Sequence, residues 1–139
     1  MKTQSFVSII SIMLFLSMFL SCSEQKKEQH LTVLSWNVWH AGHSKAYGQQ
    51  ACDGTIGILK KSQADVILMV ETYGAAPMIA DSLGYDYYLI SSNLCIFSRY
   101  PIIKKYTFPD VIDTFNFGGV EIDMDGTPVR LFDTWIHYL

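Results

Sequence analysis

The stretch Leu31-Thr-Val-Leu-Ser-Trp-Asn37 decides the fold of this 139-residue chain. Its β-branched and aromatic residues favour a strand, and that strand ends on the amide side chain of Asn37. A second apolar run, Asp65-Val-Ile-Leu-Met-Val70, is typical of a strand buried on both faces, and Glu71 follows it directly. The sequence therefore predicts a polar oxygen-bearing side chain after each of two strands.

The segment between these two strands has the length of a crossover helix, over residues 48–62. Gly54 and Gly57 weaken this helix, each by up to about 1 kcal/mol relative to alanine. Two strands joined by a helical crossover run parallel, and ligands bind beyond their carboxyl ends. We therefore expect Asn37 and Glu71 to be neighbours.

One amide oxygen and one carboxylate suit a hard cation that keeps several of its waters. These two residues, Asn37 and Glu71, therefore predict a Mg²⁺ site, with Mn²⁺ as the alternative ion. Zinc binding by His40 and His43 is less favoured, because no cysteine or second histidine pair accompanies them. Contact between His43 and a phosphate group is the better interpretation of that loop.

The rest of the chain predicts one short helix and a mostly antiparallel second half. Pro77 and Gly84 frame the short helix, and Asp125-Gly126 is a strong hairpin signal. Pro128 belongs at the beginning or on the edge of its strand. In residues 48–62, the spacing of Ile58, Leu59 and Ser62 predicts one helix face. The predicted helix covers 75–83, and the predicted strands cover 85–91, 94–97, 103–108, 115–124 and 127–137.

The first 21 residues have the anatomy of a secretory signal peptide. The segment Phe19-Leu20-Ser21-Cys22 resembles a bacterial lipobox, in which the cysteine becomes lipidated and N-terminal after cleavage. We expect Cys22 to carry a lipid anchor in a bacterial membrane and residues 22–30 to form a polar tether, which places the protein in the cell envelope, on its periplasmic or surface side. An uncleaved transmembrane anchor is less favoured, because the apolar run is near the minimum of about 18 residues and contains serines.

Residues 31–139 are enough for one small domain with a core but not for two. Without Lys2, the only charged residue of the signal, 9 basic side chains face 13 acidic ones, a net charge of −4. This balance does not indicate nucleic-acid binding, although a nucleic-acid substrate stays open. An acidic protein that acts on a phosphate ester needs a metal ion for charge compensation.

Two cysteines lie outside the lipobox. Cys52 falls in the predicted crossover helix and Cys95 inside a strand-like run. They could pair in an oxidising compartment, but their positions favour two buried free thiols.

Four segments, in this order, resemble the endonuclease/exonuclease/phosphatase family, which has the deoxyribonuclease I-like fold. The resemblance implies a mixed α+β, four-layer sandwich with two β-sheets face to face between helices. It also implies metal-assisted hydrolysis of phosphate esters. The segments are Leu34-Ser-Trp-Asn37, Asp65-Val-Ile-Leu-Met-Val-Glu71, Ile96-Phe-Ser-Arg-Tyr-Pro-Ile102 and Val129-Arg-Leu-Phe-Asp-Thr-Trp-Ile-His137.

The resemblance also implies roles for single residues. Glu71 is similar to the main metal carboxylate of the family, and Asn37 to the amide that touches metal-bound water or phosphate. His137 resembles the histidine that contacts the scissile phosphate or protonates the leaving group, although Ile136 stands where the family has a threonine. Arg99 is a candidate substrate ligand, but its Ser-Arg-Tyr-Pro turn looks structural in this family.

The family's later Asp-x-Asn segment and its final Asp-His pair have no counterpart before Leu139. Residues 31–139 are therefore expected to be the N-terminal part of such a domain. The predicted function is that of a Mg²⁺-dependent phosphodiesterase or nuclease-type hydrolase. The alternative is a non-catalytic, membrane-anchored lipoprotein that binds a phosphorylated ligand or a partner.

Overall fold

A computed structural model of the chain describes residues 28–40, 48–108 and 116–136. The chain divides into two units, Met1–His30 and Leu31–Leu139. The first unit contributes only residues 28–30, which form neither helix nor strand. Three of the predicted site residues, Cys22, His43 and His137, lie outside the described residues, as does the predicted signal peptide.

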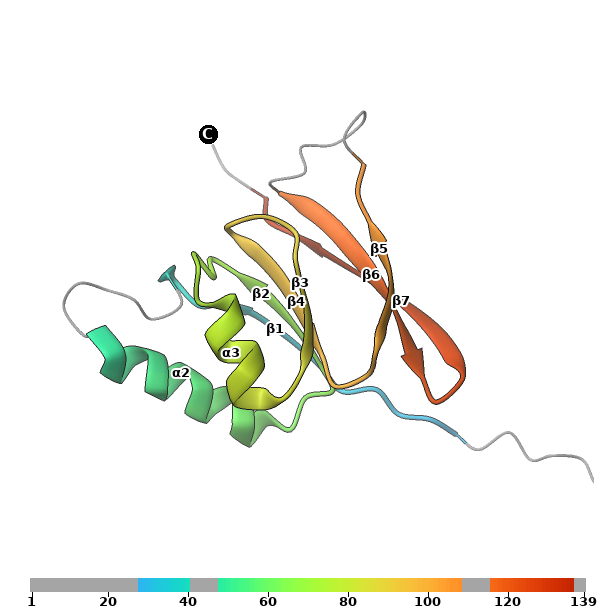
Figure 1. Cartoon of the computed structure of the whole chain (residues 1–139), viewed down its shortest axis with the longest axis horizontal. Coiled ribbons are helices and arrows are strands. Elements are labelled where there is room, and N and C mark those ends of the chain that lie inside the picture. The colour runs from blue at the N-terminus through green and yellow to red at the C-terminus, as the bar shows by residue number, and fades with distance from the viewer. Residues whose placement is uncertain (1–27, 41–47, 109–115, 137–139) are drawn as a thin grey trace, which may run out of the picture. The chain divides into compact units, whose positions relative to one another are not determined.

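The first strands of the second unit form a four-stranded mixed sheet in the order β1-β2-β4-β3 (Figure 1). β1 and β2 run parallel, as predicted, and Asn37 is level with Val70. β4 is antiparallel to both β2 and β3. The strands are β1 (Val33–Asn37), β2 (Val66–Val70), β3 (Asp86–Leu89) and β4 (Leu94–Ser98).

Helix α2 (Gly48–Ser62) is the predicted crossover between β1 and β2 (Figure 1). Its buried face carries Cys52, Thr55 and Leu59, which lie three or four residues apart. The prediction that Ile58 shares this face is wrong, because Ile58 is 53% exposed. One residue advances the helix by about 100°, so Leu59 and Ile58 cannot both point straight at the sheet.

Helix α3 (Ala76–Leu83) packs on the same face of the sheet as α2. It has a proline in its first turn and ends at Gly84, whose φ of 69° is the left-handed conformation that favours glycine. The Gly84 N–H donates to the carbonyl of Ala80 at 2.8 Å. Between the helices and the sheet lies an apolar core that includes Ile79, Ile67 and Phe97.

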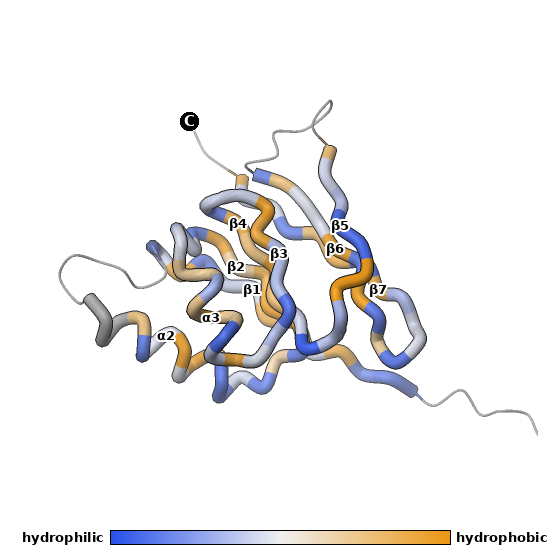
Figure 2. Tube along the Cα trace, in the orientation of Figure 1, coloured by the Kyte–Doolittle hydropathy of each residue, from blue (hydrophilic) through white to orange (hydrophobic). Residues whose placement is uncertain are grey.

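The second half of the unit forms a three-stranded antiparallel sheet, β5-β6-β7, which packs on the other face of the first sheet (Figure 1). Val66 and Ile96 of one sheet meet Val120 and Ile122 of the other, and Figure 2 shows hydrophobic residues along these strands. No described helix covers the outer face of the second sheet. The strands are β5 (Ile102–Tyr106), β6 (Phe117–Met124) and β7 (Thr127–Thr134).

Two smaller predictions are also confirmed. Pro128 is the second residue of β7, which is an edge strand of its sheet. Cys52 and Cys95 are both buried, and neither forms a disulfide bond. Across the described ranges, neither helix is long and apolar enough to cross a membrane.

Candidate functional site

Asn37 and Glu71 meet at the end of the four-stranded sheet where β1 and β2 finish, which we call the carboxyl end. The Nδ2 of Asn37 donates a hydrogen bond to Oε1 of Glu71 at 3.0 Å. The parallel register causes this meeting, because Asn37 is level with Val70, the residue before Glu71. The expectation that the two side chains are neighbours is confirmed.

The orientation of the Asn37 amide follows from its second partner. The backbone N–H of Trp39 donates to Oδ1 of Asn37 at 3.0 Å, so the amide nitrogen is the atom that faces Glu71. Both sides of the amide are therefore engaged. Asn37 holds the carboxylate in place, and the charged oxygens of the pair belong to Glu71.

Glu71 has a backbone conformation that non-glycine residues seldom adopt, with φ of 67°. Its N–H donates to Oδ1 of Asn93 at 2.8 Å. The next residue, Thr72, donates its N–H to the backbone carbonyl of Asn93 at 3.1 Å. Asn93 is fully buried, and its Nδ2 has no hydrogen-bond partner in the described structure.

The two loops that leave β1 and β2 are both in unusual backbone conformations. His40 has φ of 58° and Tyr73 has φ of 34°. Their rings stack with centroids 4.7 Å apart, so the loop after Asn37 rests on the loop after Glu71. Strained backbone of this kind gathers at ligand sites, where the surrounding structure holds it in place.

A second carboxyl group, Asp133 of β7, is buried between the sheets near this end. It lies on the same face of β7 as Leu131 and Val129, which pack in the core between the sheets. Burial raises the pKa of Asp133 to about 6, although the N–H of Thr134 donates to its Oδ1 at 3.0 Å. Its Oδ2 is buried and has no hydrogen-bond partner among the described atoms.

The position of Asp133 along the sheet follows from its strand partner Gly118. Burial raises the pKa of the Cys95 thiol, and the negative charge of Asp133 raises it further. A Cβ atom added to Gly118 would lie 2.6 Å from Cγ2 of Ile90, and Ile90 donates its N–H to the carbonyl of Leu94, the residue of β4 that pairs with the last residue of β2. Asp133 therefore belongs to the carboxyl end of the sheet.

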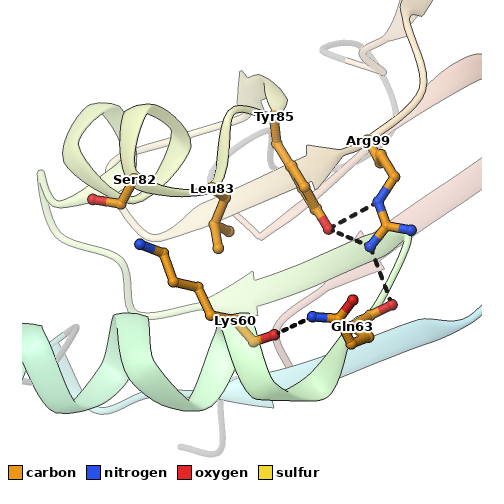
Figure 3. A pocket seen from close by; sticks show the side chains of 6 residues that line it. All are labelled: Lys60, Gln63, Ser82, Leu83, Tyr85 and Arg99. Carbon is orange, nitrogen blue, oxygen red and sulfur yellow. Dashed lines mark hydrogen bonds between the residues drawn. The ribbon is translucent and has the colours of Figure 1, made fainter.

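Arg99 lies at the other end of the same sheet, the amino end, because β4 runs opposite to β2. Its Nη1 pairs with Oδ1 of Asp65 at 2.8 Å, and its Nη2 donates to the carbonyl of Gln63 and the hydroxyl of Tyr85 (Figure 3). The structure thus does not bring Arg99 together with Asn37 and Glu71. The alternative that Arg99 ties loops together describes these contacts.

A cavity of about 370 Å³ lies beside Arg99 and is lined by residues of both helix ends (Figure 3). Lys60 and Gln63 come from the end of α2, and Ser82 and Leu83 from the end of α3. Helix carboxyl ends carry negative partial charge and accept hydrogen bonds from basic side chains. The guanidinium of Arg99 follows this pattern, because it donates to the carbonyl of Gln63 directly after α2.

The donor set at the carboxyl end fits a hard cation only in part. The described ranges hold no group of three or more His, Cys, Asp or Glu side chains that could bind a metal ion. Glu71 is partly exposed and supplies one carboxylate, which suits an ion that keeps several waters. Among the described residues, the carboxyl end therefore fits Mg²⁺ held by few protein ligands.

Sequence reasoning missed two residues of this end. Asn93 lies between the predicted strands 85–91 and 94–97, and nothing in its neighbours Ser92 and Leu94 shows that its amide holds Glu71. A signal for Asp133 was available, because it continues the inward positions Val129 and Leu131 along β7. A carboxylate at a core position of a strand is a reason to look for a site.

Neither a protein-family model nor a curated protein matches the sequence. Solved structures do match the fold. TDP2 from Caenorhabditis elegans has a TM-score of 0.66 at 18% identity, over 88% of this chain and 40% of that one. A D. rerio TDP2 humanized by 14 mutations has a TM-score of 0.57 at 19% identity, over 73% of this chain and 45% of that one.

An endonuclease/exonuclease/phosphatase family protein from Leptotrichia buccalis C-1013-b is also similar. Its TM-score is 0.54 at 17% identity, over 78% of this chain and 55% of that one. This chain thus spans between 40% and 55% of the length of these three solved chains. The described part of the chain has the mixed α+β, deoxyribonuclease I-like fold of these solved structures.

Proposed function

We propose that the protein is a Mg²⁺-dependent phosphoester hydrolase, of the phosphodiesterase or nuclease type, and that Glu71 is its main metal ligand. The observation that carries this proposal is the 3.0 Å hydrogen bond between Asn37 Nδ2 and Glu71 Oε1 at the ends of two parallel strands. The fold shared with an endonuclease/exonuclease/phosphatase family protein supports it.

The roles in this proposal are divided between the two residues. Glu71 presents an oxygen ligand at the surface, and Asn37 fixes the direction of that ligand through its amide nitrogen. When bound, Mg²⁺ supplies positive charge for the phosphate oxygens of the ester. The chain needs such a charge, because it is acidic overall, with a net charge of −3.

Two further residues of the proposal lie outside the described ranges. His137 is proposed to contact the scissile phosphate or to protonate the leaving group, and His43 to contact phosphate. The assignment of His137 depends on the sequence resemblance, and that of His43 on its place in the loop after the first strand. The substrate is proposed as a phosphoester, and the charge of the chain does not favour a long nucleic acid.

Thermal melting of the full chain with millimolar Mg²⁺ tests the metal site, and hydrolysis of bis(p-nitrophenyl) phosphate tests the reaction. Because an ion that binds only the folded state stabilises it, we expect Mg²⁺ to raise the melting temperature. Glu71→Gln keeps the side-chain volume but loses the charge, so it should abolish both the rise and the hydrolysis. Hydrolysis that survives in Glu71→Gln contradicts the metal assignment.

A non-catalytic function is the other outcome of the same experiment. A rise in melting temperature with Mg²⁺, without hydrolysis, favours a protein that binds a phosphorylated ligand. Titration with inorganic phosphate in the presence of Mg²⁺ then measures that binding directly.

We also propose that residues 1–21 are a signal peptide, that Cys22 carries lipid, and that residues 22–30 tether the protein in the bacterial envelope. Cys22→Ser should abolish metabolic labelling with radioactive palmitate and release the protein from the membrane fraction. A variant that stays labelled and membrane-bound contradicts this assignment.

A further inference from the structure

We propose that Asn93 is a positioning residue of this site, which sets the direction of the Glu71 carboxylate by holding Glu71 in a left-handed backbone conformation. The role of that carboxylate as a metal ligand rests on the proposed function. Its geometry does not depend on that function.

The first step is the backbone of Glu71. Pairing between β2 and β4 ends at Val70 and Leu94, and the next residue of β2 does not continue the strand. Glu71 instead turns to φ of 67°. A strand continued for one more residue would point its side chain elsewhere, because side-chain direction follows the backbone.

The second step is what holds this turn. The Asn93 side chain takes the place of a strand carbonyl, since its Oδ1 accepts the N–H of Glu71 at 2.8 Å. Its backbone carbonyl accepts the N–H of Thr72 at 3.1 Å and the hydroxyl of Thr72 at 3.4 Å. One asparagine therefore binds two consecutive residues of the loop that carries the ligand.

The third step is that Asn93 is itself fixed. Its N–H donates to the hydroxyl oxygen of Ser91 at 3.1 Å, and the N–H of Leu94 donates to the same oxygen at 3.1 Å. The whole side chain is buried. Because Asn93 is fixed in this way, it also fixes the backbone of Glu71. The Glu71 carboxylate is then placed to accept the hydrogen bond from Asn37.

The fourth step is that this arrangement includes two features that are unfavourable for the stability of the fold. The Nδ2 of Asn93 is buried without a hydrogen-bond partner among the described residues. An unsatisfied buried donor is unfavourable, and so is a left-handed glutamate. Both costs fall on the residues that aim one carboxylate, which is the pattern expected of a ligand site.

The test measures the Asn37–Glu71 hydrogen bond and the metal affinity separately. The full chain is purified in detergent and labelled with ¹⁵N. The side-chain amide proton that Asn37 donates to the carboxylate should resonate downfield. The Asn37→Asp variant lacks this proton and so assigns its resonance. Mn²⁺ affinity is measured by water proton relaxation. Asn93→Ala should remove the downfield shift and weaken Mn²⁺ binding by about 10-fold to 100-fold.

Ser98→Ala is the matched control. Ser98 is also fully buried on β4, and its hydroxyl oxygen accepts the N–H of Tyr100 at 3.0 Å, at the amino end of the sheet. This variant should lower the melting temperature but leave the Asn37 resonance and the Mn²⁺ affinity unchanged. An Asn93→Ala variant with the wild-type resonance and an Mn²⁺ affinity within twofold of wild type overturns the proposal.

If Asn93→Ala does not fold, Asn93→Asp decides, because it keeps a side-chain oxygen for the Glu71 N–H. The folded Asn93→Asp chain should retain the downfield Asn37 resonance, and its loss overturns the proposal. A wild-type chain that binds no Mn²⁺ overturns the proposed function, and the Asn37 resonance then tests the role of Asn93 by itself.

Discussion

The two ends of the four-stranded sheet are built in opposite ways. At the amino end, Arg99 pairs with Asp65 and donates a hydrogen bond to Tyr85. At the carboxyl end, Glu71 is in a left-handed conformation, and Asn93 and Asp133 each bury an atom without a hydrogen-bond partner in the described structure. The same strands thus carry a stabilising end and a strained end, and strain that the rest of the fold supports is typical of functional sites.

The largest expected change in the free energy of unfolding is its dependence on pH, which arises from the buried carboxyl group of Asp133. Its pKa rises from the usual 3.8 to about 6 in the folded protein. Between these values the folded state binds more protons than the unfolded state, so the free energy of unfolding falls as pH rises from about 4 to 6. The two-unit shift corresponds to about 3 kcal/mol at most, and the loss levels off above pH 6.

Urea unfolding at pH 4, 5, 6 and 7 measures this dependence, and Asp133→Asn is its control. The variant has no carboxyl group to ionise, so its stability should change much less over the same range. An equal slope in the two proteins would assign the pH dependence to other groups.

Asp65→Ala removes the hydrogen bonds that Asp65 accepts at the amino end. The change removes the partner of Arg99 Nη1, at 2.8 Å, and the acceptor of the Thr32 N–H, at 2.9 Å. We expect a loss of about 1 kcal/mol in the free energy of unfolding, because two hydrogen bonds are lost but Arg99 and Thr32 are exposed and can bind water instead. The measurement is the urea midpoint at constant m-value, and Mn²⁺ affinity should stay at the wild-type level. A drop in affinity would mean that the two ends are coupled.

Glu71→Gly tests whether the left-handed backbone at the carboxyl end costs stability. Glycine adopts φ of 67° without the side-chain clash, so the variant should gain up to about 1 kcal/mol of stability. The rise in melting temperature with Mg²⁺ should disappear at the same time. Glu71→Ala also loses the carboxylate but keeps the strain, so the difference between the two variants isolates the backbone. Equal stabilities would show that the conformation of Glu71 costs nothing.

The smallest expected change in stability comes from glycine positions that lie outside both ends of the four-stranded sheet. Gly57 lies inside α2, and a Cβ atom added there meets no atom within 4 Å. Gly57→Ala should therefore stabilise the protein by about 0.5 to 1 kcal/mol. Gly119→Ala should do the opposite, because its Cβ would lie 2.4 Å from Cδ1 of Phe132. Differential scanning calorimetry of the two variants checks both signs, and a destabilised Gly57→Ala would contradict the account of α2.

Local patterns predicted most of the elements. The unbroken apolar run before Glu71 required a strand buried on both faces, and the Asp125-Gly126 pair fixed the hairpin between β6 and β7. Because β1 and β2 are parallel, the meeting of Asn37 and Glu71 followed from connection rules. These features depend on residues close in sequence or on general topology, and such features can be predicted from one sequence.

What could not be predicted depends on three-dimensional contacts between distant residues. Nothing local distinguishes Asn93 from an ordinary turn residue, because its partner Glu71 lies 22 residues away. The same holds for Arg99, whose place at the opposite end of the sheet follows only from the antiparallel course of β4. The inward direction of Asp133 was readable from the alternation in β7, but its high pKa depends on the sheet packed against it.

The buried thiols of Cys52 and Cys95 can report how the protein opens. Cys52 lies on a helix that contacts the sheet from one side, whereas Cys95 lies in the interior of a strand with neighbours on both flanks. A thiol reagent reaches a buried cysteine only when the surrounding structure opens. The labelling rate of Cys52 would report the detachment of α2, and that of Cys95 the unfolding of the sheet. A single reagent could therefore follow two opening events in a chain whose third cysteine, Cys22, is blocked by the proposed lipid.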